Sequence, residues 1–151
     1  PMSDGTYFDQ LYAAKEALAY DVNHDIQGNR IVGVIYHHMF NDTPNKPCFS
    51  YFQVRYLGNN KVSLVLFFRS HDYGSALFGN LCSIAYAFNY FVIAPNLCTL
   101  DEIIVVSTSG HIYENDSQLA EEITGIPWNV VGMKIDGEKP ETPPGCDQTV
   151  I

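Results

Sequence analysis

The chain of 151 residues carries little positive charge. Eight Lys and Arg stand against 17 Asp and Glu, and the formal net charge is −9 at pH 7. A protein that wraps a nucleic-acid duplex normally presents a basic face. The composition argues against such a face, so we expect no nucleic-acid polymer as a partner. A small anionic ligand remains compatible with it, because a few cations are enough to hold one.

Long uninterrupted apolar runs are also missing. A membrane-spanning helix needs about 18 or more apolar residues in succession. The longest candidate, 76–94, is interrupted by Gly79, Asn80, Ser83 and Asn89. We therefore expect no membrane partner. The first residues show no charged-then-apolar signal pattern, and we expect the chain to be cytoplasmic.

The four cysteines form no recognisable metal pattern. Cys48, Cys82, Cys98 and Cys146 give neither a Cys-x-x-Cys pair nor a Cys/His spacing typical of zinc. We therefore predict no metal. Scattered cysteines without a signal peptide fit a reducing compartment better than a disulfide framework.

What the chain does have is enough apolar and aromatic sequence for one core. Hydrophobic residues make up 46%, with 10 Tyr and 9 Phe. The pattern predicts a single compact α+β domain over 1–151, a mixed β-sheet packed against helices, with 136–151 as a loose tail. Helices are predicted over 7–20, 74–94 (buried) and 115–125, and strands over 29–38, 48–57, 60–70, 101–113 and 128–135.

A predicted hairpin brings a thiol to a cation. With Gly58 and Asn59 as the two loop residues, Cys48 pairs with Arg69 across the strands. With Asn59 and Asn60 as the loop, Cys48 would face His71 instead. Cross-strand neighbours have Cβ atoms about 4.5–5.5 Å apart.

A cation beside a thiol favours the thiolate, which is the nucleophilic form. The plainer alternative is that Cys48 is a small buried hydrophobe and that Arg69 extends its head group into water. Spacing alone favours this alternative.

Two further signals carry polar groups. His111 and Tyr113 would share one face of a strand and could hold neighbouring sugar hydroxyls. The alternative is a Tyr packed at a sheet edge beside a solvent-facing His.

Asn80 lies in an otherwise apolar helical stretch, where a buried amide costs about 1–3 kcal/mol unless it is paired. It could cap a backbone group, or read the amide edge of a ligand.

These segments occur in the same order as the motifs of a known family, which the chain resembles. The segments "GNRIVGVI" (28–35), "KPCFSYFQVRY" (46–56), "FFRSHDYGSALFGN" (67–80) and "SGHIYEND" (109–116) are similar to motifs in the C-terminal catalytic half of thymidylate synthase and the pyrimidine hydroxymethylases. The resemblance implies that fold, a homodimer, a pyrimidine nucleoside monophosphate such as dUMP as substrate, and 5,10-methylenetetrahydrofolate as the one-carbon donor.

The resemblance also implies roles for single residues. Cys48 would be the nucleophile that adds to C6 of the pyrimidine, so that C5 can accept the one-carbon unit. Asp72 would stand near the folate side of the pocket. The substrate would be held at its phosphate by Arg69, Ser70 and Arg30 of the neighbouring subunit, at its uracil edge by Asn80, and at its ribose by His111 and Tyr113.

The chain departs from the family in places. Phe49 replaces the His that usually follows the cysteine, and the family's N-terminal portion, with a catalytic Glu and the Trp residues of the folate site, is not recognisable. The expected function is therefore a thymidylate-synthase-like transferase. A non-catalytic nucleotide-binding module and a dimerisation protein that keeps only the fold are the alternatives.

Overall fold

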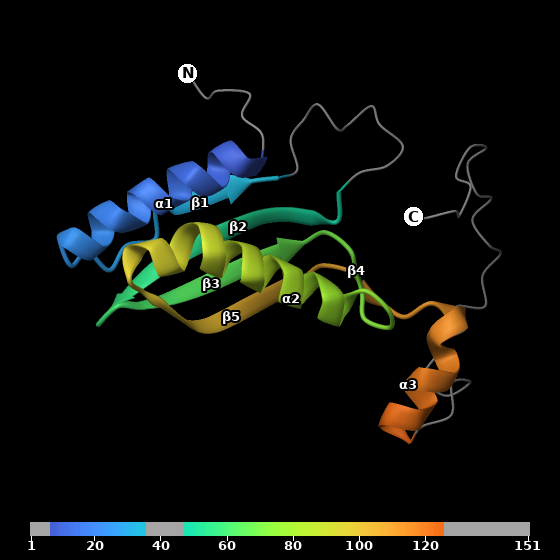
Figure 1. Ribbon diagram of the computed structural model, residues 1–151. Coiled ribbons are helices and arrows are strands. Elements are labelled where there is room, and N and C mark those ends of the chain that lie inside the picture. Colours follow the sequence, from blue (N-terminus) through green and yellow to red (C-terminus); the bar gives the residue numbers. More distant parts are fainter. Residues whose placement is uncertain (1–6, 36–46, 126–151) are drawn as a thin grey trace.

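The computed structural model describes residues 7–35 and 47–125. Its centre is a mixed sheet with the strand order β1-β2-β3-β5, in which β5 runs parallel to β3 and the other neighbours are antiparallel (Figure 1). The strands are β1 (Ile31–Val34), β2 (Phe49–Gly58), β3 (Lys61–Phe68) and β5 (Thr99–Ser107). The predicted α+β class is confirmed.

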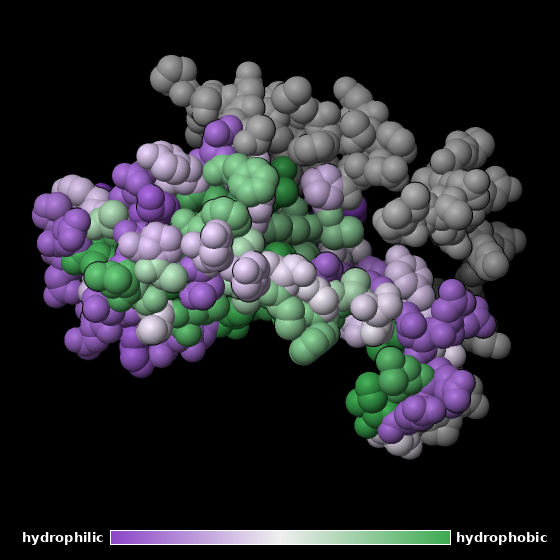
Figure 2. Space-filling view, in the orientation of Figure 1, coloured by the Kyte–Doolittle hydropathy of each residue, from purple (hydrophilic) through white to green (hydrophobic). Residues whose placement is uncertain are grey.

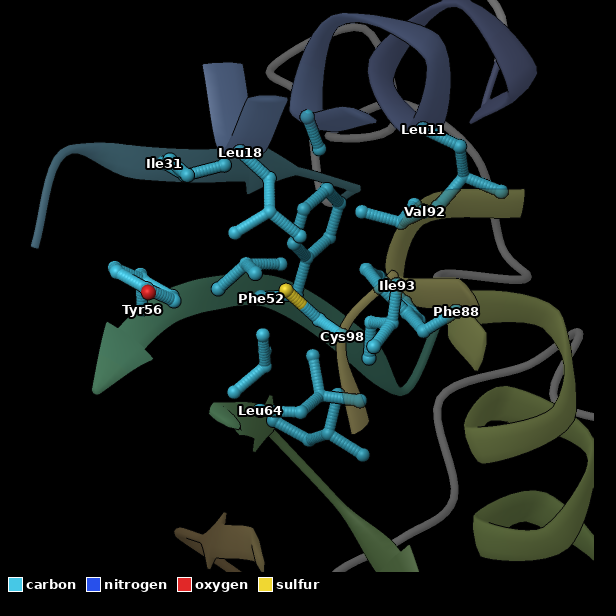
Figure 3. Packing of buried hydrophobic residues seen from close by; sticks show 14 of the residues in the cluster. Leu11, Leu18, Ile31, Phe52, Tyr56, Leu64, Phe88, Val92, Ile93 and Cys98 are labelled. Carbon is cyan, nitrogen blue, oxygen red and sulfur yellow. The ribbon is translucent and has the colours of Figure 1, made fainter. Parts of the chain in front are cut away.

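One face of the sheet is covered by the first helix, α1 (Tyr7–Asn23). Its buried residues Leu11, Ala14 and Leu18 recur at helical spacing, so that one stripe meets the sheet. They pack with Phe52 and Leu64 in a continuous core (Figure 3). Alternation along β2 directs the odd-numbered residues from Gln53 to Leu57 to the opposite face, as the period of a strand requires.

The second helical segment joins three kinds of helix. The α-helix α2 (Leu77–Phe88) continues into a π-helical turn, η2 (Asn89–Ile93), and a short 3₁₀ turn, η3 (Ala94–Asn96). The segment ends at Leu97, whose φ of 57° cannot continue a right-handed helix. The predicted helix is confirmed.

The predicted burial of this helix is wrong. Within 77–96 only Phe88, Val92 and Ile93 belong to the buried core, and Leu81 and Ile84 pack against it partly buried. Over the described residues, Leu77–Asn96 is long and apolar enough to cross a membrane by length and composition, with 17% of its apolar window buried. This differs from the expectation drawn from its interrupting residues. Figure 2 shows apolar side chains gathered in the middle of the face formed by α1 and α2.

A small second sheet interrupts the predicted strand 101–113. The strand β5 ends at Ser107, and Gly110–His111 forms β6, which pairs in parallel with β4 (His71–Asp72). The helix predicted over 115–125 is confirmed in kind as η4 (Glu114–Asp116) and α3 (Ser117–Thr124), which ends at Gly125 with φ 69°. The predicted strand 128–135 and tail 136–151 lie outside the described residues.

The opposite face of the main sheet is open and apolar. Val32 and Val34 of β1 are each 52% exposed, and Ile104 and Val106 of β5 are also exposed. Between them, the rings of Tyr51 and Phe67 stack at 4.8 Å. No helix covers this face within the described ranges.

Candidate active site at the ends of β2, β3 and β5

Cys48 and Arg69 meet where β2 begins and β3 ends. The Arg69 backbone N–H donates to the Cys48 carbonyl at 2.9 Å, as in an antiparallel pair. The Arg69 guanidinium Nη2 lies 4.0 Å from Cys48 Sγ, and its Nε donates to the Pro47 carbonyl at 3.0 Å. The thiol is free and exposed. The predicted approach of the thiol and the cation is therefore present, and the buried-hydrophobe alternative for Cys48 is wrong.

The pairing of Cys48 with Arg69 was predicted, but the turn from which it was predicted is wrong. The turn residues are Asn59 and Asn60, with φ of 52° and 57°, not Gly58 and Asn59. Two positive φ values are typical of a type I′ hairpin turn, and Asn tolerates them. That turn alone would place Cys48 opposite His71.

Two β-bulges in β2 reverse this shift. Tyr56 pairs with Val62 while Gly58 pairs with Lys61, and the extra residue between them is Leu57. Ser50 is the second extra residue, since Phe49 and Tyr51 face consecutive residues of β3. Each bulge moves the register by one. Cys48 thereby returns to Arg69.

The end of β5 fixes Arg69 from the other side. Thr108 Oγ1 donates to the Arg69 carbonyl at 2.7 Å, and the Thr108 backbone N–H donates to the Phe68 carbonyl at 3.0 Å. Arg69 is thus held through its backbone by both neighbouring strands. Ser70 follows it directly and is half-buried.

Asp72 shapes the turn that leads into α2. Its carboxylate accepts hydrogen bonds from the Gly74 and Ser75 backbone N–H groups, at 2.9 and 3.3 Å, and from the Ser75 hydroxyl. Burial by itself raises the pKa of Asp72, but the hydrogen bonds from Ser75 and Gly74 and the charge of His111 outweigh it, so the net pKa is lowered. Asp72 is an anionic anchor of this turn.

The small sheet brings His111 beside Asp72, its register partner in β4. The Tyr73 backbone N–H donates to the His111 carbonyl at 2.8 Å. The rings of His111 and Tyr113 touch edge to face with centroids 4.8 Å apart, and Tyr113 is exposed. The two rings lie together, although the strand predicted over 101–113 is not continuous: β6 ends at His111, and Tyr113 lies beyond it, just before η4.

Asn80 lies in the first turn of α2 and is exposed. The expectation of a buried amide is wrong, because Asn80 lies on the exposed side of the helix, while Leu81 and Ile84 are the residues that pack against the core. The side chain therefore bears no desolvation cost within the described chain. Its position eight residues after Asp72 places it just beyond the turn that Asp72 anchors.

Arg30 lies at the other end of the sheet and is exposed. It precedes β1, whose Ile31 pairs with Val54. Cys48 lies about 20 Å away along β2, at a strand rise of about 3.3 Å per residue. One protomer therefore does not bring Arg30 to the cluster, and the resemblance assigned it to the neighbouring subunit.

His71 is the site residue that sequence reasoning missed. It is 2% exposed, and its ring stacks on Phe68 with centroids 4.0 Å apart. A histidine between two polar residues gives no periodic signal of burial, so only the packing reveals it.

Depressions of the described surface include one beside the Cys48–Arg69 pair and one remote from it. One of about 450 Å³ lies on the open sheet face, lined by Val32, Val34, Ser50, Tyr51 and Arg69. It is the one that adjoins the Cys48–Arg69 pair. The other, of about 500 Å³, lies between α1 and η2 among Phe8, Tyr12, Tyr90 and Phe91 and is remote from that pair. In residues 7–35 and 47–125 no group of His, Cys, Asp and Glu is arranged to hold a metal.

The comparisons with known proteins agree with the geometry. The model of the thymidylate synthase family matches residues 1–143. No curated protein matches the chain significantly. Because the family model covers nearly the whole sequence, including the Cys48–Arg69 pair and the small sheet, the chain belongs to the thymidylate synthase family, whose members are transferases of nucleotide biosynthesis.

Proposed function

We propose that this chain binds a pyrimidine nucleoside monophosphate of the dUMP kind and transfers a one-carbon unit to C5 of its ring through a covalent bond to Cys48. The observation that carries the proposal is the contact between the exposed Cys48 thiol and the Arg69 guanidinium, 4.0 Å apart. A guanidinium has five N–H donors in a planar fork, so one side chain can contact a phosphate and the protein together.

Arg69 and Ser70 would hold the phosphate, next to the depression that opens onto the sheet face. The Asn80 amide would donate to O4 and accept from N3–H of uracil, because it offers both kinds of group. His111 and Tyr113 would meet the ribose with their adjacent tips.

In the reaction, the Cys48 sulfur forms a bond to C6, and the C5–C6 electron pair moves toward C5 and O4. C5 then forms its bond to the one-carbon unit as the bond from that carbon to one folate nitrogen breaks, and C5 loses its proton. The C6–S bond breaks to restore the double bond and the thiolate, and the remaining carbon–nitrogen bond breaks when a hydride of the reduced folate or a water molecule completes a methyl or hydroxymethyl product. Methylenetetrahydrofolate would be the co-substrate that supplies the carbon. Among the described residues, Asp72 would stand near the folate side of the pocket.

The second candidate is a nucleotide-binding module without chemistry. The observation that favours it is that the Asp72 carboxylate is already engaged by the Gly74 and Ser75 turn. A carboxylate held in this way stabilises the fold without any folate.

We also propose a homodimer formed through the open face of the main sheet. This face carries contiguous exposed apolar side chains on β1, β2 and β5. Family members are typically dimeric. In such a dimer, Arg30 would serve the phosphate site of the partner, which one protomer cannot supply by itself.

Calorimetric titration with dUMP, with dCMP as the matched comparison, tests the binding step. We expect selective binding of dUMP near one per subunit; no binding of either nucleotide contradicts the proposal. Release of tritium from C5 of labelled dUMP, in the presence of the folate, then separates the two candidates. Cys48→Ser should abolish this release and leave binding intact, whereas binding without release in the parent protein favours the module.

A further inference from the structure

His71 is held from several sides in the interior. Its ring stacks on Phe68 at an interplanar angle of 13° and lies against the Tyr73 ring at 5.5 Å. Its backbone N–H donates to the Ser109 carbonyl at 2.8 Å. Its Nδ1 lies 3.3 Å from Ser107 Oγ, at the last residue of β5. The one side chain therefore joins the ends of β3 and β5 to the small sheet.

The ring is suited to its place only in the neutral form. Its Nε2 is buried and has no hydrogen-bond partner among the described residues. A neutral imidazole carries one N–H, but a protonated one carries two, and the second would be left unpaired. Burial lowers the pKa of His71; the negative charge of Asp72 opposes this in part and His111 adds to it.

The neighbours of His71 in the chain, Ser70 and Asp72, are residues proposed to meet the phosphate and the folate. In an extended segment alternate side chains point to opposite sides. His71 and Asp72 are consecutive residues of β4, so with His71 turned inward Asp72 turns outward; Ser70 lies in the bend between β3 and β4, and both Ser70 and Asp72 are half-buried. The orientation of these two side chains depends on what keeps the imidazole inside.

We propose that His71 is the positioning residue of the nucleotide site. Its stacking on Phe68 and its hydrogen bond to Ser107 set the directions in which the Ser70 and Asp72 side chains point. The inference rests on the proposed function. It assigns a role to a residue that makes no contact with the ligand and to a serine, Ser107, that lies outside the motifs.

The test removes the hydrogen bond from the Ser107 side, where the change of volume is small. Ser107→Val and Ser107→Thr have nearly the same shape, and only Thr keeps the hydroxyl. The matched control is Ser63→Ala on β3, which removes a buried hydroxyl that has no hydrogen-bond partner within residues 7–35 and 47–125. His71→Phe keeps a ring that can stack on Phe68 but removes the imidazole nitrogen that bonds to Ser107. The measurements are the Kd for dUMP and amide hydrogen exchange over 71–75.

We expect Ser107→Val and His71→Phe to raise the Kd for dUMP roughly two- to tenfold, the effect of one ordinary hydrogen bond, and to speed exchange over 71–75. Ser107→Thr and Ser63→Ala should behave as the parent protein in both measurements. Equal Kd values and equal exchange for Ser107→Val and Ser107→Thr would overturn the inference.

The same design separates this inference from the proposed function. If the parent protein binds no dUMP, the proposed function is wrong, and exchange alone decides the role of His71. Faster exchange in Ser107→Val but not in Ser107→Thr would then still show that the imidazole orders this segment. Unchanged exchange in both variants would remove the positioning role as well.

Discussion

Arg69 and Cys48 face each other across the end of the hairpin only because two bulges in β2 correct a register that the turn sets differently. The backbone bond of 2.9 Å between them fixes their strands, and the contact of 4.0 Å between Nη2 and Sγ joins their side chains. Bulges are often found next to active sites, where they redirect a side chain. Here they align Cys48, the proposed nucleophile, with Arg69.

Arg69→Lys should weaken nucleotide binding although it keeps the charge. A lysine has no planar fork, so it loses the bond from Nε to the Pro47 carbonyl and bidentate contact with a phosphate. We expect the Kd for dUMP to rise about tenfold or more in a calorimetric titration. Arg55→Lys, on β2 and distant from the thiol, is the control. An unchanged Kd in Arg69→Lys would show that the phosphate is held elsewhere.

Val106→Glu should dissociate the proposed dimer. The substitution places a charge on the edge strand β5 of the open sheet face, where it would be buried against the second copy. Sedimentation velocity should show a dimer for the parent protein and a monomer for the variant. Ile123→Glu, at an exposed apolar position of α3, should leave the dimer intact. A parent protein that is monomeric at micromolar concentration would contradict the proposed interface.

Two glycine substitutions should have opposite effects on stability. At Gly110 an added Cβ would lie 2.1 Å from Tyr73 Cε2, so Gly110→Ala must displace that ring and with it the pairing of β4 with β6. We expect a loss of about 1–3 kcal/mol in the free energy of unfolding.

At Gly79, in α2, an added Cβ meets no atom of another described segment within 4 Å. Gly79→Ala should therefore stabilise the protein by about 0.5–1 kcal/mol, because alanine loses less backbone entropy in a helix. Urea denaturation measures both variants. Equal effects of the two substitutions would show that Tyr73 does not pack on Gly110.

Asp72→Asn should make stability less dependent on acid pH. The pKa of Asp72 is lowered in the folded protein, so its stabilising effect is complete above the unfolded pKa of about 3.9 and is lost as pH falls through the folded pKa. We expect the parent protein to be more stable than the variant by about 1 kcal/mol at pH 7, as for a capping carboxylate.

That difference should shrink in urea titrations as the pH is lowered toward 3. Asp25→Asn is the control, because Asp25 is exposed with φ 50°, a conformation that Asn also tolerates. A difference between Asp72→Asn and the parent protein that stays constant with pH would show that the charge of Asp72 does not stabilise the turn.

The local pattern of apolar and polar residues was sufficient to predict most of the helices and strands. Helical spacing predicted a helix from residue 7, and α1 begins there and ends at Asn23. Alternation predicted β2 and β3 nearly to their ends, because one face of each strand is buried and the other is not. The approach of Cys48 to Arg69 was also predicted, although by a turn that does not occur.

The sequence by itself determined which segments are helix or strand and which carry the polar residues, because periodicity and turn preferences act over a few residues. Only the tertiary structure decided the rest. The exposure of Asn80, the inward turn of His71, and the break between β5 and β6 depend on which surfaces meet. Those contacts join residues far apart in the chain, such as His71 with Ser107 and Tyr73 with Gly110, and no local pattern of side chains specifies them.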